Sequence, residues 1–252
     1  LFLLAPVIAL ITSLLGWGVV PFGAGLTLAD LSLGILYLLA VGSLGVYGVL
    51  MAGWSANSKY AFLGGLRSTA QMVSYEVVMG LIILTVVLLV GSLNLTTIIQ
   101  AQINVWYIFP LLPLSLMFLI SVIAETNRAP FDLPEAESEL VAGFFTEHSS
   151  VPFVLFFLAE YASMILMSTL VSMLFLGGYL IPFVYFENPT FFSFEGLTLG
   201  LKASLILFIY IWVRASFPRL RYDQLMSFTW TGMLPLTLGF IILVPCILMA
   251  FE

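Results

Sequence analysis

Charged residues are so unevenly spaced in this chain that five long stretches contain none. The charge-free stretches are 1–29, 31–58, 77–124, 161–186 and 224–251. A charge at the centre of a lipid bilayer costs about 2.5–3.5 kcal/mol on insertion scales, so these stretches mark what lipid can cover. Each is longer than the roughly 20 residues that a helix needs to cross a bilayer. The spacing predicts an integral membrane protein and excludes a water-soluble enzyme.

The apolar stretches are uniformly hydrophobic, which favours helices over the alternating strands of a barrel. Only 8% of the 252 residues are charged, against about 25% in soluble chains. The longest stretch is divided at the polar residues 92–97. The predicted fold is an all-α polytopic bundle, a single membrane domain over 1–252 with about seven transmembrane helices. The predicted spans are 1–22, 31–53, 69–91, 106–124, 151–181, 198–216 and 228–250.

Six of the seven basic residues follow the second, fourth and sixth predicted spans, so they fall on one side of the membrane. They are Lys59, Arg67, Arg128, Arg214, Arg219 and Arg221, and Lys202 alone falls on the other side. Basic loops face the cytoplasm or the mitochondrial matrix. We therefore expect the N-terminus of this chain on the matrix or cytoplasmic side and the C-terminus on the opposite side.

The chain is poor in residues that bind metals or redox cofactors. It contains one cysteine, Cys246, and one histidine, His148. A zinc site, an iron–sulfur cluster or a bis-histidine haem each needs several such ligands. We predict no metal site, and any redox cofactor must lie in another chain. Cys246 is interpreted as a packing residue, and His148 as a hydrogen-bonded side chain rather than a proton carrier.

Two acidic residues lie inside predicted spans, where they are costly. Glu76 and Glu160 come seven to nine residues after the start of spans that begin on the basic side, which places each roughly 10–14 Å below that surface. A carboxylic acid inside a membrane protein often exchanges a proton. The preferred interpretation is a proton relay. The alternatives are a hydrogen bond between helices and an ion pair with an arginine of another chain.

One dense polar tract, 125–140, follows the fourth span. Its charged residues are Glu125, Arg128, Asp132, Glu135, Glu137 and Glu139. Pro134 suits the first turn of a new short helix, in which the first and last acids of the 135–139 stretch share a face. Like charges four residues apart repel, and a charged cavity would relieve that repulsion. The alternative is a solvated acidic loop.

The last basic loop contains three arginines, Arg214, Arg219 and Arg221. Three interpretations are open from the residues. The arginines can fix the topology with lipid phosphates as partners, dock an acidic surface of another protein, or pair with the acidic tract.

These motifs resemble a known family. The tract from Glu125 to Gly143 resembles the signature of subunit 1 of respiratory complex I, NADH:ubiquinone oxidoreductase. Residues 57–64, 73–76 and 212–226 are similar to the same family. The resemblance implies a subunit that lies where the membrane arm of the complex meets its peripheral arm. The loops on its basic side would help form a chamber for ubiquinone. The resemblance also implies that ubiquinone is a substrate, while NAD, FMN and iron–sulfur clusters lie only in partner subunits.

The resemblance further implies location and partners. Members have eight transmembrane helices, and the seven expected here begin with the family's second, so the first is either a separate chain or trimmed. The chain begins with Leu1 and shows no signal-peptide pattern, and we expect a segment to precede it. The implied partners are other membrane-arm subunits, peripheral-arm subunits and membrane lipid, with no nucleic acid. The mitochondrial inner membrane is the expected location, with the bacterial plasma membrane as the alternative.

Position by position, the resemblance assigns roles to two groups of charged residues. It implies that one group leads from the quinone chamber into the membrane: Glu76, Glu125, Glu147 and Glu160. It implies that the other forms the charged loop beside the chamber: Arg128, Asp132, Glu135, Glu137 and Glu139. Residues 145–148 depart from the family pattern, because His148 stands where the family usually has tyrosine.

The resulting hypothesis is a complex I subunit that couples quinone reduction to proton translocation through buried carboxylates. The first alternative is the related subunit of a membrane-bound hydrogenase, which predicts a nickel-containing partner. The second is a stand-alone proton-coupled transporter, which predicts activity without partners. The third is an assembly scaffold, in which replacing the acids changes only the amount of complex.

Overall fold

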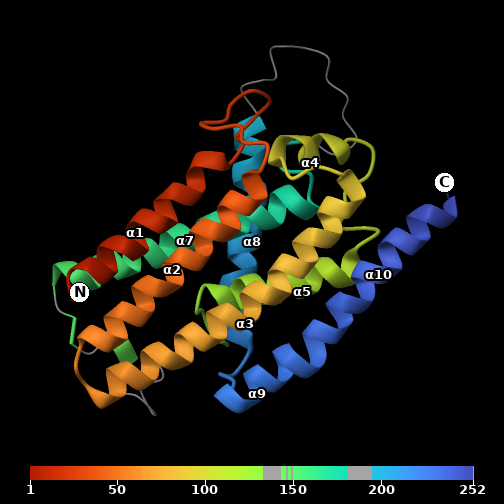
Figure 1. Cartoon of the computed structure of the whole chain (residues 1–252). Helices are drawn as coiled ribbons and strands as arrows, with labels where there is room; N and C mark the ends of the chain where they lie inside the picture. Colours follow the sequence, from red (N-terminus) through yellow and green to blue (C-terminus); the bar gives the residue numbers. More distant parts are fainter. Residues whose placement is uncertain (133–142, 146, 149, 181–194, 252) are drawn as a thin grey trace.

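The computed structural model describes residues 1–132, 143–145, 147–148, 150–180 and 195–251, and helices make up the regular structure in these ranges (Figure 1). An isolated bridge joins Gly23 and Leu26. The helices are α1 (Leu4–Leu15), α2 (Gly34–Ser55), α3 (Lys59–Val90), α4 (Leu95–Ala101), α5 (Leu112–Glu125), α7 (Val151–Phe175), α8 (Glu195–Ser216), α9 (Tyr222–Ser227) and α10 (Leu234–Phe251). Three short segments accompany them: Gly16–Val19 and Gly143–Phe145 are 3-10 turns, and Phe228–Met233 is a π-helix.

The helices confirm the predicted class of fold. Five are long and apolar enough to cross a membrane, namely α2, α3, α7, α8 and the continuous helix Tyr222–Ala250 that contains α9 and most of α10. Two shorter apolar helices, Leu4–Val19 and Leu112–Glu125, lie within or across the first and fourth predicted spans. The chain is a polytopic helical membrane bundle. The limits of its membrane-embedded part and its treatment as one domain stay predictions.

The helices α1, α2, α3, α5 and α7 pack around one another. Helix α1 packs against both α2 and α7, while α3 packs against α2, α5 and α10 (Figure 1). Glycines allow the closest approach: a Cβ atom on Gly53 of α2 would lie 2.9 Å from the carbonyl oxygen of Ala61 and 3.1 Å from Cα of Gly65, both in α3. Since real Cβ atoms do not approach a backbone oxygen that closely, these helices need glycine where they meet.

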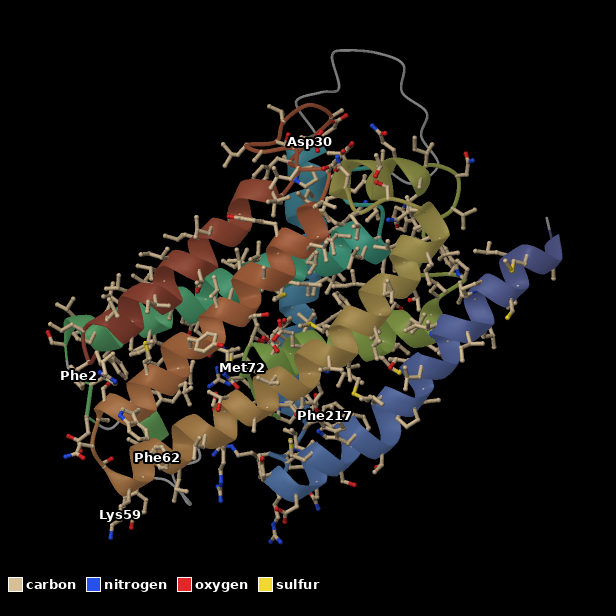
Figure 2. The ribbon with its side chains drawn as sticks, viewed as in Figure 1. Phe2, Asp30, Lys59, Phe62, Met72 and Phe217 are labelled. Carbon is tan, nitrogen blue, oxygen red and sulfur yellow. The ribbon has the colours of Figure 1, made fainter. Side chains whose placement is uncertain are left out.

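Two helices differ in length from the spans predicted for them, and local contacts at their ends explain why. Helix α3 begins ten residues before the predicted 69, because the Ser58 side chain accepts a hydrogen bond from the backbone N–H of Ala61 and caps the helix. Helix α7 ends at Phe175, before the predicted 181, because Gly177 and Gly178 follow with φ of 72° and 53°. Figure 2 shows Lys59 and Asp30 at opposite ends of the bundle, so α2 and its flanking turns cross its whole length.

Lys202 binds the end of a neighbouring helix. Its ammonium group, on α8, donates hydrogen bonds to the carbonyl oxygens of Leu176, Gly178 and Leu180, at 2.7, 2.8 and 2.6 Å. The same Nζ lies 4.5 Å from the ring centre of Trp106, a cation–π distance. Carbonyl groups at a helix end have no partner within the helix, and a cation there is favourable. Lys202 therefore joins α8 to the C-terminal end of α7.

Candidate functional site

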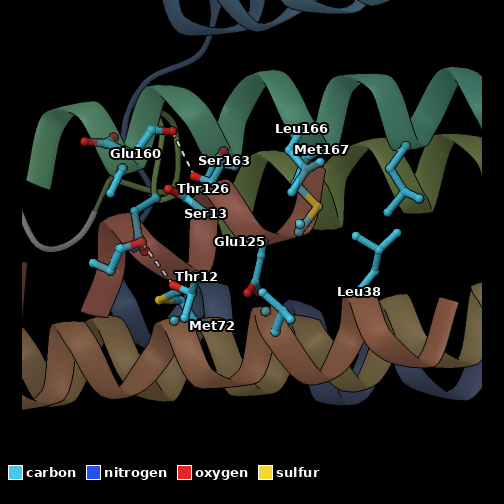
Figure 3. A pocket seen from close by; sticks show the side chains of 18 of the residues that line it. Thr12, Ser13, Leu38, Met72, Glu125, Thr126, Glu160, Ser163, Leu166 and Met167 are labelled. Carbon is cyan, nitrogen blue, oxygen red and sulfur yellow. Dashed lines mark hydrogen bonds between the residues drawn. The ribbon is translucent and has the colours of Figure 1, made fainter. Parts of the chain in front are cut away.

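A cavity of about 160 Å³ lies inside the bundle, between α1, α2, α3, α5 and α7 (Figure 3). Along α7 its lining residues run from Phe156 to Leu174, with Glu160 and Ser163 in the first half and apolar side chains in the second. The polar lining residues are Thr12, Ser13, Glu125, Thr126, Asn127, Asp132, Glu160 and Ser163. The cavity is therefore apolar over much of its length and carries acids toward the end where α7 begins.

Glu125 is the most enclosed acid of the cavity. It is the last residue of α5 and only 7% exposed, and its Oε2 has no hydrogen-bond partner among the described residues. Figure 3 shows its side chain reaching into the cavity between helices. A buried carboxyl oxygen without a partner is costly unless it carries a proton or meets water or a ligand. This oxygen of Glu125 therefore needs a proton, a water molecule or a ligand beside it.

Gln71 holds the backbone around Glu125 in place. This α3 side chain is fully buried, and its Nε2 donates to the carbonyl oxygens of Ala124, at 2.8 Å, and Phe131, at 2.9 Å. The amide therefore ties the end of α5 and the start of the acidic tract to α3. The motifs in the sequence did not point to Gln71. The available signal was an amide inside a predicted membrane span, because such a group needs partners.

Glu160 forms an ion pair within the chain. Its Oε1 lies 2.9 Å from Nε of Arg128, and both side chains are largely buried, at 17% and 14% exposed. This Nε makes no hydrogen bond within the described part of the chain, so the attraction is mainly Coulombic. The guanidinium group also lies 4.5 Å from the ring centre of Tyr161. An ion pair was one of the alternatives for Glu160, but its arginine belongs to this chain, and Glu160 still lines the cavity.

Glu76 faces a different hollow. Its Oε1 is hydrogen-bonded to Oγ of Ser43 on α2, and the carboxyl lines an outward groove of about 560 Å³ together with Tyr47, Thr69 and Met226. Glu125 therefore lines the interior cavity, whereas Glu76 lines the outer groove.

The acidic tract meets the last basic loop. Nη2 of Arg219 lies 3.2 Å from Oδ2 of Asp132, and the backbone N–H of Leu220 donates to the Pro130 carbonyl oxygen at 3.1 Å. Pairing with the tract was one of the three interpretations of these arginines, and it holds for Arg219. The Arg219 side chain is 41% exposed, so the ion pair contributes about 0–1 kcal/mol.

The remaining predicted site residues lie away from this cluster or outside the described residues. Glu147 is exposed in the turn before α7 and does not line the cavity. Glu135, Glu137 and Glu139, with the short helix predicted from Pro134, lie outside the described residues. Within the described ranges, no group of three histidine, cysteine or acidic side chains is placed to hold a metal ion.

His148 lies in an aromatic cluster beside the cavity. It is 5% exposed, stacks on Phe2 with ring centres 4.2 Å apart, and meets Phe156 edge-on at 5.2 Å. Burial lowers the pKa of His148, and the Ala52 carbonyl and Glu147 oppose part of that shift. The imidazole is therefore neutral at neutral pH and packs as an aromatic ring in place of the tyrosine usual in the resembling family.

Acid should loosen this cluster. Because the pKa of His148 is lower in the folded chain than its ordinary 6.5, the unfolded segment binds the proton more tightly. Stability is then full above about pH 6.5 and falls as the pH drops from there through the lowered pKa. The measurement is the hydrogen-exchange protection factor of α1 amides between about pH 7.5 and 5.5. The factors should fall in the native chain and stay level after His148→Phe; equal slopes in both would contradict the assignment.

The helices and the cavity together define the class of protein. It is a polytopic membrane protein with an internal cavity that is apolar over much of its length and acidic at one end. A family model described as NADH dehydrogenase matches residues 1–245. The chain is 61% identical over 253 residues to NADH-ubiquinone oxidoreductase chain 1 of Mycosarcoma maydis, covering 100% of this chain and 76% of that protein. It is 55% identical over 257 residues to an NADH-quinone oxidoreductase subunit of Rhodospirillum centenum, covering 100% and 74%. The chain belongs to the subunit 1 family of respiratory complex I, as its motifs predicted.

Proposed function

We propose that this chain is the membrane subunit of NADH:ubiquinone oxidoreductase that admits ubiquinone to the internal cavity. The observation that carries the proposal is the distribution of side chains in that cavity. Ubiquinone combines a polar headgroup with a long apolar tail, and the cavity combines apolar walls with an end that contains Glu125, Asp132 and Glu160. The names of its relatives, which refer to ubiquinone or quinone, support the same substrate.

Electrons reach the quinone from partner subunits in this proposal. Reduction of one quinone to quinol takes up two electrons and two protons. With one cysteine and one histidine in the sequence, this chain contributes no iron–sulfur cluster, and NAD, FMN and such clusters lie in the peripheral arm. Its partners are then the peripheral-arm subunits at the basic-side loops and the other membrane-arm subunits. The surrounding membrane is the mitochondrial inner membrane, with the N-terminus on the matrix side.

Buried carboxylates couple the reduction to proton movement. A charge change near the cavity alters the protonation of Glu125, of the charged loop and of Glu147, and the change is passed to Glu160 and Glu76. At 4 Å and an effective dielectric constant of about 20, two unit charges interact by roughly 4 kcal/mol, which is enough to change which form of a carboxyl is populated. The positions of Glu125 at the cavity and of Glu76 at the outer groove support this route.

The test is to fill the cavity from its α7 wall. Ser163 lines the cavity, whereas Leu158, on the same helix, is 52% exposed on the outer surface. Ser163→Trp should lower ubiquinone reduction by NADH in membrane vesicles about tenfold or more, because the indole occupies the space for the headgroup. NADH oxidation by an artificial acceptor, which takes electrons before the quinone, should stay unchanged. Leu158→Trp is the matched control and should leave both rates unchanged.

Labelling identifies the substrate directly. A ubiquinone with a photoreactive group on its headgroup should attach to peptides of α3 and α7 that contain Met72 and Met167, which line the cavity. Excess ubiquinone should suppress the labelling. Attachment only to outward-facing peptides, together with a normal rate in Ser163→Trp, would overturn the proposal.

A further inference from the structure

Ser43 holds an unusual position opposite the intramembrane acid Glu76. Its hydroxyl oxygen, on α2, is hydrogen-bonded to Oε1 of Glu76 and also lies 3.0 Å from the carbonyl oxygen of Leu39, one turn earlier in its own helix. A serine in a helix often makes a hydrogen bond of this kind to the carbonyl oxygen one turn earlier. The hydrogen bond to Glu76 is different, because it joins α2 to α3 and its partner is a group that can carry a proton.

One hydroxyl proton cannot serve both acceptors at once. A serine hydroxyl donates one hydrogen bond and accepts two. When Glu76 is ionised, the Ser43 hydroxyl donates to the carboxylate. When Glu76 is protonated, the carboxylic acid donates to the Ser43 oxygen, whose own proton turns to the Leu39 carbonyl. The heavy-atom positions satisfy both states, so the bond can reverse without moving either helix.

The pair lies in the wall between the two hollows of the molecule. Gly42 and Gly45, on either side of Ser43, line the interior cavity, while Ser43 lines the outer groove. On α3, Met72 and Met79 line the cavity, while Glu76, between them in sequence, lines the groove. Glu76 and Ser43 therefore lie where α2 and α3 pack together, between the cavity and the groove. In the proposed coupling, an electrostatic change in the cavity would reach the groove through Glu76.

We propose that Ser43 is a positioning residue for Glu76, which keeps the carboxyl in place in both of its proton states by reversing the direction of their hydrogen bond. The inference rests on the proposed coupling function and deepens it by naming the group that supports one relay acid. It predicts that losing the hydroxyl matters only while position 76 can gain and lose a proton.

The experiment measures ubiquinone reduction by NADH in the assembled complex, normalised to NADH oxidation by an artificial acceptor. Ser43→Ala should lower the normalised rate about tenfold, equivalent to about 1.4 kcal/mol, which suits a lost hydrogen bond to a charged group. Ser43→Thr, which keeps the hydroxyl, should restore most of the rate. Ser43→Cys, of similar size but a weak donor, should be slow and replaces the alanine variant if that complex does not assemble. Ser204→Ala is the matched control, because Ser204 bonds only within its own helix among the described contacts.

The double variant separates positioning from packing. If Ser43 acts through Glu76, Ser43→Ala combined with Glu76→Gln should be no slower than Glu76→Gln alone. Multiplying effects, or a normal rate in both Ser43→Ala and Ser43→Cys, would overturn the inference while leaving the coupling proposal standing, provided that Glu76→Gln is slow. A normal rate in Glu76→Gln would overturn both.

Discussion

Replacing Glu125 with glutamine is expected to lower ubiquinone reduction by NADH about 100-fold, the size typical of losing a group that transfers a proton. Glutamine keeps the shape of the side chain but cannot ionise. Glu125 is nearly fully buried and lines the cavity, so both its proton and its electrostatic influence would be lost. The measurement compares the ubiquinone-dependent rate with the rate of an artificial acceptor in the same vesicles.

Two matched variants make the Glu125 result specific. Glu125→Asp keeps an ionisable group and should retain much more of the rate than the glutamine variant. Asp223→Asn removes an exposed acid of α9, outside the cavity lining, and should change nothing. A native ubiquinone-dependent rate in Glu125→Gln would mean that this carboxyl neither carries the proton nor influences those that do.

Replacing Arg128 with methionine is expected to destabilise the folded chain by about 3–5 kcal/mol, because it leaves the buried charge of Glu160 without its nearest cation. The 2.9 Å separation and the low exposure of both side chains place the pair where water screens little. The expected result is a strong decrease in the amount of assembled complex and in the temperature at which it loses activity. Both are measured in vesicles from matched cultures.

Adding Glu160→Gln to Arg128→Met should restore the amount of assembled complex. The double variant removes the unpaired charge, so we expect much of the complex to return, although quinone reduction stays slow because a relay acid is missing. Arg128→Lys keeps a positive charge but loses the planar stacking on Tyr161, and should fall between the native chain and Arg128→Met. A native amount of complex in Arg128→Met would contradict the importance of this pair.

The class of fold was predictable because lipid excludes charge so strongly that the charged residues alone delimit the helices. The ends of the helices were less predictable, since they depend on single local contacts. Ser58 starts α3 earlier than hydrophobicity suggests, by capping it, and Gly177 ends α7 early through its positive φ. Hydrophobicity averaged over about 20 residues cannot detect either event.

The site was predictable in its residues but not in its pairing. Glu76 and Glu160 were candidates because a carboxyl inside a span is costly, and Glu125 because the resemblance to the family assigns it to the same route. The structure places Glu125 and Glu160 at one cavity. Sequence distance could not show that Arg128 is the partner of Glu160, since the pairing depends on how α5 and α7 pack. Nor could the estimated depth of Glu76 show that it faces another hollow, because depth says nothing about the side of a helix.

The most direct test of the coupling is infrared difference spectroscopy of the assembled complex, comparing bound ubiquinone with bound ubiquinol in the carbonyl-stretching region of protonated carboxyl groups. We expect reduction to change that region in the native complex, and Glu125→Gln to remove a defined part of the change. Identical difference spectra in the native complex and in Glu125→Gln, Glu160→Gln and Glu76→Gln would show that these acids do not respond to quinone reduction, and would contradict the proposed coupling.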